Sequence, residues 1–477
     1  MTRPDYARPG GPWDVAPLTH LPPPAVVDGE VAFTPAQVAD RARALAGGLR
    51  ARGVVRGDVV AFQHGTTLAA VVAYHACWAA GVVALPIHHR ASDTEAERLA
   101  RAGGAVLRLS ATGRPGWIAT DEVSAEPIEP VEVAGSDLAV LLVTSGSSGP
   151  AKLVRHTHRG LAGKAHTMVS AHGLTSADVV LMPAPLAHIS GLLNGVLVPG
   201  AAAMRTVLME RWDAAAALDV IAREHVTFMT GPPTFVLDLL ADPRCARATG
   251  SLRLVSSGGA AVTEAIVDRA TDGLRAVVKR TYGSTEAPTV TTTHVGDDAA
   301  HARSTDGRPT TDVELRIVAD GVDVPDGSVG EVFVRGPEIA EGYVDPDATA
   351  ASFTADGWFR TGDLGTLTGG WLTIRGRASD TIIRGGENIA PDEIERACAR
   401  LPGVRAVVAV GYPDERLGER VALVVEADRP PDLVSVHDAC AAAGLARFAW
   451  PDRVVAVASI PRLPAGKPDR GALRKVV

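Results

Sequence analysis

Apolar residues along most of the chain follow two patterns, one typical of helices and one typical of buried strands. After Thr34 they recur at helical spacing as far as Leu49, and Gly53 ends that segment. Short, nearly unbroken apolar runs such as 58–62 indicate strands. The same two patterns predict helices over 68–80, 212–224, 234–240 and 263–273 and strands over 82–85, 137–143, 179–182, 225–230, 253–256 and 276–279. Strands that alternate with helices predict right-handed crossovers and a layered α/β fold.

The pattern changes twice toward the C-terminus. From Asp312 onward, the segments VELRIV, GEVFVRG and GWLTIRG are short alternating strands between Gly, Pro and Asp turns, which predicts a small β-rich subdomain. After Asp380 come helical and strand patterns over 391–399, 404–410, 421–425 and 434–443. These elements predict a compact α+β unit of the size of a small domain. The segment 4–28, in contrast, has no clear period and is predicted to be an irregular lead-in.

Length and composition fit a globular protein with more than one core. A chain of 477 residues is too long for a single core and predicts roughly two to four domain-sized units. Its 46% hydrophobic and 21% charged residues are ordinary for a soluble globular protein. The net charge of -8 is spread without long acidic or basic blocks, which argues against a nucleic-acid-binding surface. An anionic ligand would therefore need local positive charge.

The N-terminal segment and the cysteines bear on location. The first thirty residues are rich in proline and lack an apolar core behind a basic start, so no signal peptide is expected. The most apolar span, 71–86, is interrupted by Tyr74 and His75, which predicts a core helix that runs into a strand and no membrane span. Neither a disulfide framework nor a zinc site is indicated by the four widely spaced cysteines, Cys77, Cys245, Cys398 and Cys440. A reducing cytoplasm is the expected location.

A loop rich in glycine and serine follows the apolar run 137–143. Small hydroxyl residues and glycines are interleaved where the chain must turn, at Thr144, Ser145, Gly146, Ser147, Ser148 and Gly149. Such a loop can direct backbone N–H groups and hydroxyls at a polyanion, and Lys152 adds a positive charge. The spacing differs from the Walker pattern, so an ordinary P-loop NTPase is not indicated. By itself, a loop of this composition is more often a plain connector.

Four further stretches carry residues suited to a nucleotide or a carboxylate. They are TYGSTE at 281–286, TGD at 361–363, GRASD at 376–380 and AGK at 465–467. With all five stretches in this order, nearly the whole chain resembles the adenylate-forming superfamily of acyl-CoA synthetases, peptide-synthetase adenylation domains and luciferases. The resemblance implies a large N-terminal domain over 1–378 that binds ATP and the acyl group. It also implies a smaller, mobile α+β domain over 379–477 that carries a catalytic lysine.

The reaction implied by the resemblance has two halves. A carboxylic acid and ATP with Mg²⁺ form an acyl-adenylate and pyrophosphate, and the thiol of coenzyme A then displaces AMP. One alternative is an enzyme that only adenylates and passes the acyl group to an acyl or peptidyl carrier protein or to a separate thiolating partner. Another is a nucleotide-binding protein without catalysis. The joint presence of Glu286, Asp363 and Lys467 argues against that second alternative.

The TYGSTE stretch would hold the adenine ring and the metal. The resemblance implies that Tyr282 stacks on adenine, Thr285 contacts a phosphate and Glu286 binds Mg²⁺. Gly283 and Ser284 belong to the same nucleotide-binding turn. A hard cation that bridges phosphate oxygens needs oxygen ligands, which a glutamate supplies. From the residues alone, the stretch could also be a strand end with a solvated glutamate.

Two more parts of the nucleotide site follow from the resemblance. Gly258, Gly259 and Ala260 would lie against adenine and the acyl group, although these residues alone also suit a plain turn. Asp363 would accept hydrogen bonds from the ribose hydroxyls, and Arg377 would lie nearby on the ribose or a phosphate. An isolated aspartate in this setting is more commonly a turn residue.

The C-terminal region would supply the catalytic lysine and a loop for the thiol. The resemblance implies that Lys467 stabilises the negative charge that develops as the carboxylate attacks the α-phosphate. An isolated lysine at this position would instead be a solvated surface residue. Gly385 and Gly386 match a loop that lines the pantetheine tunnel in relatives. They also suit the approach to a helix that begins at Pro391, and both interpretations can hold.

His188 would lie beside the substrate carboxylate and the entering thiol, although a single histidine is more often a core or turn residue. Ile189 and Ser190 follow it, without the aspartate that many peptide-synthetase relatives use to pair with an α-ammonium. This favours an acid without an α-amine. The segments 191–195 and 256–261 are rich in small and aliphatic residues, which favours a bulky apolar acyl or aryl group.

Several positions depart from the family pattern. In the glycine-rich loop, Ala151 replaces a usual proline and Leu153 a usual glycine. At the hinge, Ser379 stands where lysine or aspartate is usual; a small residue can still absorb a backbone rotation, but the missing charge bears on thioester formation. His88 and His89 lack further ligands nearby and are interpreted as loop residues, not as a metal pair.

Overall fold

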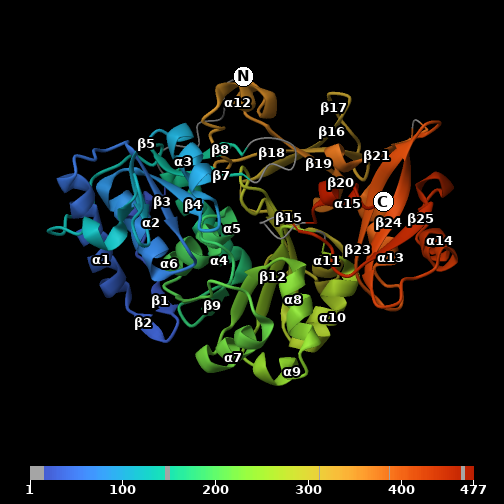
Figure 1. The fold of residues 1–477 in the computed structure, drawn as a ribbon, viewed down its shortest axis with the longest axis horizontal. Helices are drawn as coiled ribbons and strands as arrows, with labels where there is room; N and C mark the ends of the chain where they lie inside the picture. The colour runs from blue at the N-terminus through green and yellow to red at the C-terminus, as the bar shows by residue number, and fades with distance from the viewer. Residues whose placement is uncertain (1–14, 145–150, 261, 311, 386, 463–467) are drawn as a thin grey trace.

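The computed structural model describes residues 15–477 apart from 145–150, 261, 311, 386 and 463–467. The predicted site residues outside the described ones are Ser145, Gly146, Ser147, Ser148, Gly149, Gly386 and Lys467. Within the described chain the strands form four sheets. Figure 1 shows the first sheet at the left, the second below the centre, the third across the top and the fourth, in the C-terminal unit, at the right.

The first sheet has the strand order β6-β5-β3-β4-β7-β8. Its strands are β3 Val59–His64, β4 Val83–His88, β5 Ala105–Ser110, β6 Ile118–Ala119, β7 Leu138–Val143 and β8 Leu153–Thr157. Neighbouring strands pair in parallel except β7 and β8. The helices of this region are α1 Pro35–Ala51, α2 Leu68–Ala80 and α3 Asp93–Ala102. Thr34 and Gln37 form a capping box that starts α1, and Gly81, in the left-handed region at φ 70°, ends α2.

The second sheet has the order β15-β14-β13-β12-β11-β9-β10-β1-β2. Its strands are β1 Ala25–Asp28, β2 Val31–Phe33, β9 Val179–Met182, β10 Arg205–Leu208, β11 Phe228–Gly231, β12 Leu254–Gly258, β13 Val277–Tyr282, β14 Thr291–Thr292 and β15 Arg308–Pro309. The central strands from β1 to β13 pair in parallel. The helices around it are α4 His158–His172, α5 Ile189–Leu192, a π-helical turn Leu193–Leu197, α6 Val198–Ala201, α7 Ala214–Glu224, α8 Pro233–Ala241, α9 Cys245–Ala248, α10 Glu264–Leu274 and α11 Ala299–Ser304.

The largest hydrophobic core lies between these two sheets. It joins α2 and α4 with strand residues such as Phe62 of the first sheet and Phe228 of the second. The loops that leave the strands also meet: Thr66, just after β3, donates from Oγ1 to the carbonyl of Ala184, just after β9, over 3.3 Å. The carboxyl ends of strands in both sheets therefore face a common region.

The prediction of an irregular lead-in over 4–28 is wrong at its end. Residues Ala25–Asp28 form β1, which pairs in parallel with β10, a strand that the sequence pattern also did not reveal. The apolar run of β1 is short, follows Pro22 to Pro24, and pairs with a segment far along the chain. A local pattern carries no information on such a partner.

The predicted β-rich subdomain is the third sheet, with the order β17-β16-β18-β19-β20. Its elements are β16 Glu314–Ala319, β17 Val322–Asp323, β18 Val329–Arg335, α12 Pro346–Ser352, β19 Phe359–Thr368 and β20 Trp371–Arg377. Neighbouring strands pair antiparallel. The 3-10 turn Ala378–Asp380 then leads out of this sheet into the C-terminal unit.

The C-terminal unit has a sheet of order β22-β21-β24-β23, with β25 in parallel beside β24. Its elements are β21 Ile382–Arg384, β22 Glu387–Ile389, α13 Pro391–Cys398, β23 Val404–Asp414, β24 Gly418–Ala427, α14 Leu433–Ala442, β25 Arg453–Val457 and α15 Arg470–Leu473. Helices α13 and α14 share a separate core with the sheet. The layered α/β part, the β-rich subdomain and the α+β unit are those that the sequence predicts.

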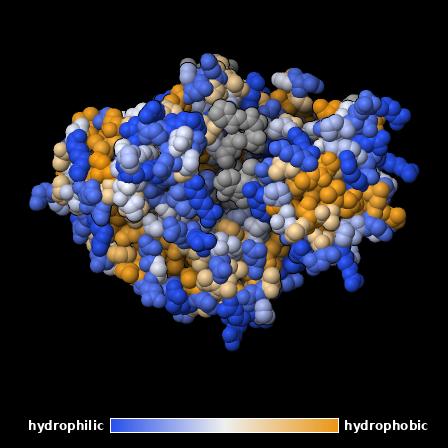
Figure 2. Space-filling model, in the orientation of Figure 1, coloured by the Kyte–Doolittle hydropathy of each residue, from blue (hydrophilic) through white to orange (hydrophobic). Residues whose placement is uncertain are grey.

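The outer surface is mostly polar on the face shown in Figure 2, and apolar residues gather on the right, over the C-terminal unit. Exposed large apolar side chains of that unit include Ile383, Val434 and Phe448. Across the described residues, no helix combines the length and apolar character that a bilayer span requires. The four cysteines, all within the described chain, are free.

Candidate active site

Most of the predicted site residues follow the carboxyl ends of parallel strands. Tyr282 ends β13, Gly258 ends β12, His188 lies in the loop after β9, and Thr144 follows β7. In open α/β sheets, ligands bind outside the carboxyl ends of the strands. Strands and loops far apart in the sequence are therefore brought to one edge of the molecule.

Tyr282, Asp363 and Arg377 form one hydrogen-bonded group. The Oη atom of Tyr282 donates to Oδ2 of Asp363 over 2.7 Å, and Nε of Arg377 donates to Oδ1 over 2.7 Å. Asp363 lies in β19 opposite Arg377 in β20, so sheet register sets this pair and Asp363 is not a turn residue. Burial and the charge of Asp363 raise the pKa of Tyr282, which keeps the phenol protonated as a donor.

The backbone before Asp363 is held by its neighbours. Gly362 has a φ of 71°, a region that favours glycine, and its N–H donates to Oε1 of Glu331 over 3.2 Å. Thr361 donates from Oγ1 to the carbonyl of Val332 and accepts from the N–H of Asp363. These hydrogen bonds fix the backbone at Asp363 and so orient its side chain relative to β19.

Glu286 accepts two hydrogen bonds from one segment of the β-rich subdomain, the residues 340–343 between β18 and β19. Oη of Tyr343 donates to Oε1 of Glu286 over 2.7 Å, and the N–H of Ala340 donates to its carbonyl over 2.8 Å. The carbonyl of the preceding Thr285 accepts from Nε2 of the buried His156 over 2.8 Å. Burial lowers the pKa of His156 to about 4, so its ring is neutral with the proton on Nε2.

A tight turn presents Glu286 after β13. The N–H of Ser284 donates to the carbonyl of Ala287, and the N–H of Ala287 donates to Oγ of Ser284. A Cβ atom on Gly283 would lie 2.4 Å from the backbone nitrogen of Thr289, so only glycine fits that close approach.

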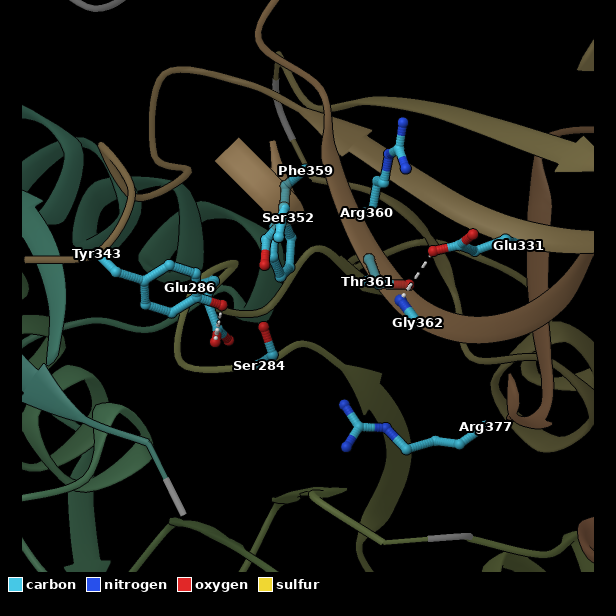
Figure 3. Close-up of a pocket in the computed structure, with 11 residues that line it drawn as sticks. Ser284, Glu286, Glu331, Tyr343, Ser352, Phe359, Arg360, Thr361, Gly362 and Arg377 are labelled. Carbon is cyan, nitrogen blue, oxygen red and sulfur yellow. Dashed lines mark hydrogen bonds between the residues drawn. The ribbon is translucent and has the colours of Figure 1, made fainter. Parts of the chain in front are cut away.

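A cavity of about 350 Å³ adjoins both groups. Figure 3 shows Glu286 and Tyr343 on one side of it and Arg377 on the opposite side. Glu331 and Gly362 lie on the same side as Arg377. Its lining residues are Ser284, Glu286, Glu331, Tyr343, Ala351, Ser352, Phe359, Arg360, Thr361, Gly362 and Arg377. The predicted metal ligand and the predicted ribose or phosphate ligand thus share one cavity.

Thr144 and Lys152 close the base of the glycine-rich loop. The N–H of Thr144 donates to the carbonyl of Lys152, and the N–H of Lys152 donates to Oγ1 of Thr144. The Nζ atom of Lys152 lies 4.9 Å from the ring centroid of Tyr343, in cation–π geometry. Tyr343 therefore contacts both Lys152 and Glu286.

Gly258 and Gly259 allow a close approach at the end of β12. A Cβ atom on Gly258 would lie 2.5 Å from the carbonyl oxygen of Thr281, its partner in β13, and Gly259 has a φ of 78°. Ala260 follows directly. Gly258 therefore lets β12 lie close to β13, whereas the space beside Gly259 is open.

His188 begins α5 and joins two other histidines. Its ring lies 5.3 Å from that of His88, which stacks at 4.6 Å on His89. Burial lowers the pKa of His188 and lowers that of His88 to about 4, so these rings are neutral at neutral pH. Among the described residues, no group of three or more His, Cys, Asp or Glu side chains is arranged to hold a metal ion. His88 itself ends strand β4, so only His89 is a loop residue as predicted.

Gly385 turns between β21 and β22, with a φ of 61°. Its N–H donates to the carbonyl of Leu417 over 2.7 Å. The helix predicted after this loop is α13, which begins at Pro391. The predicted approach to a helix is therefore confirmed, and the role of Gly385 beside a pantetheine thiol stays a prediction.

Sequence reasoning missed Tyr343, Glu331 and His156. The contacts of Tyr343 with Glu286 and of Glu331 with Gly362 join segments that are remote in sequence. Each residue has an ordinary local context, so no local signal marked it.

The sequence matches the AMP-binding enzyme family over residues 19–344 and the AMP-binding enzyme C-terminal domain over residues 393–467. The chain belongs to the AMP-binding enzymes, in the adenylate-forming superfamily.

The relatives of this adenylate-forming enzyme include CoA ligases along most of its length. The chain is 34% identical to 3-[(3aS,4S,7aS)-7a-methyl-1,5-dioxo-octahydro-1H-inden-4-yl]propanoyl:CoA ligase of Rhodococcus jostii, over 94% of this chain and 95% of that one. ATP-bound MatB from Rhodopseudomonas palustris has a TM-score of 0.86 at 30% identity, over 98% of both chains. O-succinylbenzoate coenzyme A synthetase from Bacillus subtilis, solved with ATP and magnesium, has a TM-score of 0.83 at 27% identity, over 94% of this chain and 96% of that one.

These similarities confirm the predicted fold class of a large N-terminal part and a small C-terminal part. They also confirm the prediction of an adenylate-forming acid–CoA ligase that uses ATP, Mg²⁺ and coenzyme A. The domain boundary at 378/379 and the roles of individual residues stay predictions.

Proposed function

We propose that this enzyme forms the acyl-adenylate in the cavity shared by Glu286 and Arg377. The observation that carries the proposal is this shared cavity, because a metal ligand and a ribose or phosphate ligand must act on one nucleotide. The acid attacks the α-phosphate of ATP and releases pyrophosphate. The thiol of coenzyme A then attacks the acyl carbon, and the C–O bond to AMP breaks.

Asp363 and Tyr282 hold the nucleoside in this proposal. The carboxylate of Asp363 already accepts one hydrogen bond on each oxygen, and each oxygen keeps a lone pair for a ribose hydroxyl. The bond from Tyr282 fixes its ring, whose face is offered to adenine. Gly258, Gly259 and Ala260 lie beside the base in this proposal, and the open space at Gly259 leaves room for it.

Glu286 fits the role of the magnesium ligand. Tyr343 occupies only Oε1, and a carboxylate oxygen is the hard donor that Mg²⁺ prefers. Mg²⁺ is commonly held by one or two carboxylates with phosphates and water, which agrees with the lack of a larger ligand cluster among the described residues. When bound, the ion supplies charge neutralisation for the phosphates. Thr144, Thr285 and Lys152 are the proposed phosphate ligands, together with the glycine-rich segment of the sequence at 145–149.

The substrate is proposed to be a carboxylic acid with a bulky apolar acyl or aryl group and no α-amine. His188 is followed by Ile189 and Ser190, neither of which is an acid that could pair with an ammonium. Relatives named medium-chain fatty-acid–CoA ligase, indoleacetate–CoA ligase and feruloyl-CoA synthase support this class.

The relatives support coenzyme A as the thiol acceptor, and we propose that Gly385 and Gly386 contribute to its binding. The alternative is transfer to a carrier protein or a separate thiolating partner. Pyrophosphate release over a panel of acids identifies the substrate, and thioester formation with free coenzyme A against carrier protein separates the acceptors. Acid-independent or absent pyrophosphate release would instead support a nucleotide-binding protein without catalysis.

We propose a reducing cytoplasm as the location. All four cysteines are free and buried, including Cys398 and Cys440, whose side chains are hydrogen-bonded to each other in the core of the C-terminal unit. Persistent thiols at such a contact are expected where glutathione keeps cysteines reduced.

A further inference from the structure

Lys164 of α4 is completely buried and has three hydrogen-bond or ionic partners. Its Nζ lies 2.6 Å from Oε1 of Glu338, 3.0 Å from the carbonyl of Thr289 and 2.8 Å from Oγ1 of Thr310. Both charged side chains are 0% exposed. Each of the three ammonium protons therefore has an acceptor.

Stability alone is a weak reason for this ion pair. Burial lowers the pKa of Lys164, and the nearby charge of Glu338 opposes that effect. Desolvation of two charges offsets much of their attraction, and apolar replacements of a buried pair are often neutral or stabilising. The geometry that the pair maintains is the better explanation.

One partner of Lys164 ends the turn that presents Glu286. Thr289 has a φ of 39°, a strained conformation for a β-branched residue, and its backbone nitrogen packs closely over Gly283. The ammonium of Lys164 binds the carbonyl of Thr289. It therefore anchors the strained end of the turn 283–289.

Glu338, the ionic partner of Lys164, belongs to the segment that donates hydrogen bonds to Glu286. Glu338 precedes Ala340, which donates to the carbonyl of Glu286, and Tyr343, which donates to its carboxylate. The pair of Lys164 and Glu338 thus joins α4, the turn after β13 and the segment 336–343. All three meet directly behind Glu286.

We propose that Lys164 and Glu338 are positioning residues that fix the carboxylate of Glu286 and so set how tightly the enzyme binds magnesium-bound ATP. This inference rests on the proposed role of Glu286. It adds two residues, neither in contact with the nucleotide cavity, to the machinery of the metal site.

The decisive variant is the double substitution Lys164→Met with Glu338→Met, which removes both charges at similar volume. Its thermal midpoint should fall only slightly, because relief of the desolvation of two charges offsets the loss of the donor to the carbonyl of Thr289. Titration calorimetry with ATP should show binding on the order of 10-fold weaker in Mg²⁺, as for the loss of groups that orient metal ligands, and unchanged binding in EDTA. Wild-type affinity in Mg²⁺ would overturn the proposal. Glu338→Gln, measured in the same way, decides the matter if the double variant does not fold.

Two further variants separate the possible failures. Glu286→Gln should lose the magnesium-dependent part of ATP binding. If it keeps that part, the proposed role of Glu286 as the magnesium ligand is wrong. If Glu286→Gln loses it and the double variant keeps it, only the positioning proposal fails. The matched control is Lys279→Met in β13, where a buried ammonium donates to the carbonyls of Ala171 and Thr293. It should lower stability and leave magnesium-dependent binding intact, and an equal loss there would also contradict the proposal.

Discussion

The phenol of Tyr343 donates a 2.7 Å hydrogen bond to the carboxylate of Glu286. Burial and the charge of Glu286 raise the pKa of Tyr343, so the phenol stays protonated across the physiological range. Lys152 covers the face of the same ring. A single aromatic side chain therefore links the base of the glycine-rich loop to the proposed magnesium ligand.

Replacing Tyr343 with Phe should weaken catalysis without unfolding the protein. The ring and its contact with Lys152 remain, but Glu286 loses the donor that orients it. We expect acid-dependent ATP–pyrophosphate exchange to fall by roughly 10- to 100-fold. Tyr412→Phe, in which Arg453 still covers the ring in the C-terminal unit, is the matched control and should exchange at the wild-type rate. Equal rates for both variants and the wild type would remove Tyr343 from the site.

Asp363→Asn should raise the KM for ATP by at least about 10-fold. The amide keeps the shape but removes the charge that holds Arg377 and accepts from Tyr282, and hydrogen bonds to charged groups are worth about 1.5–3 kcal/mol each. Steady-state kinetics with Tyr282→Phe and the double variant form a double-mutant cycle. Strictly additive effects would mean that the bond of Tyr282 to Asp363 has no part in nucleotide binding.

The turn Ala378–Asp380 is the covalent link between the third sheet and the C-terminal unit. Ser379→Pro should restrict its backbone and slow thioester formation at least about 10-fold, while pyrophosphate exchange is retained, because we propose that the C-terminal unit rotates only for the second half-reaction. Ser379→Ala, which loses only a 3.4 Å contact with Asp380, should behave like the wild type. A parallel loss of both half-reactions in Ser379→Pro would argue against a hinge here.

Asp392 should make stability depend on pH. Burial and the charge of Glu395 raise its pKa to about 7, and the opposing charges of Arg470 and Arg396 do not outweigh them, since Arg470 also pairs with Glu395 and Asp380. A carboxyl with a raised folded-state pKa binds more protons in the folded state, so its contribution is present below about pH 4 and is lost as pH rises through 7.

Asp392→Asn removes this titration. Urea unfolding from pH 5 to pH 8 should show the wild type losing stability relative to the variant as pH rises. Parallel profiles of the two proteins would mean that Asp392 is ionised in the folded state throughout this range.

The sequence predicted elements whose signals are local. The apolar run of α2, which ends at Gly81, predicted a helix with the observed bounds. The alternating strands of the third subdomain were also found in place. Strand β1 was missed because its partner β10 lies far along the chain and its own run is short.

Sequence motifs predicted which residues belong to the site but not the hydrogen bonds that join them. The motifs around Tyr282, Asp363 and Arg377 named residues that the structure brings together, yet their bonds depend on the register of β19 and β20. The pair of Lys164 and Glu338 has no local pattern, because each would be an ordinary polar residue in its own segment. Packing of three segments alone brings these charges into contact.

The most direct test of the account is ATP–pyrophosphate exchange that depends on a carboxylic acid, measured for the wild type and for Lys467→Ala. We expect exchange in the wild type with Mg²⁺ and the acid, and a loss of about 10²- to 10³-fold or more in the variant with ATP binding kept, because the charge on the transition state is no longer stabilised. Lys475→Ala, at an exposed lysine near the same end of the chain, should exchange normally. Exchange near the wild-type rate in Lys467→Ala, or release of ADP and phosphate in place of pyrophosphate, would contradict the account.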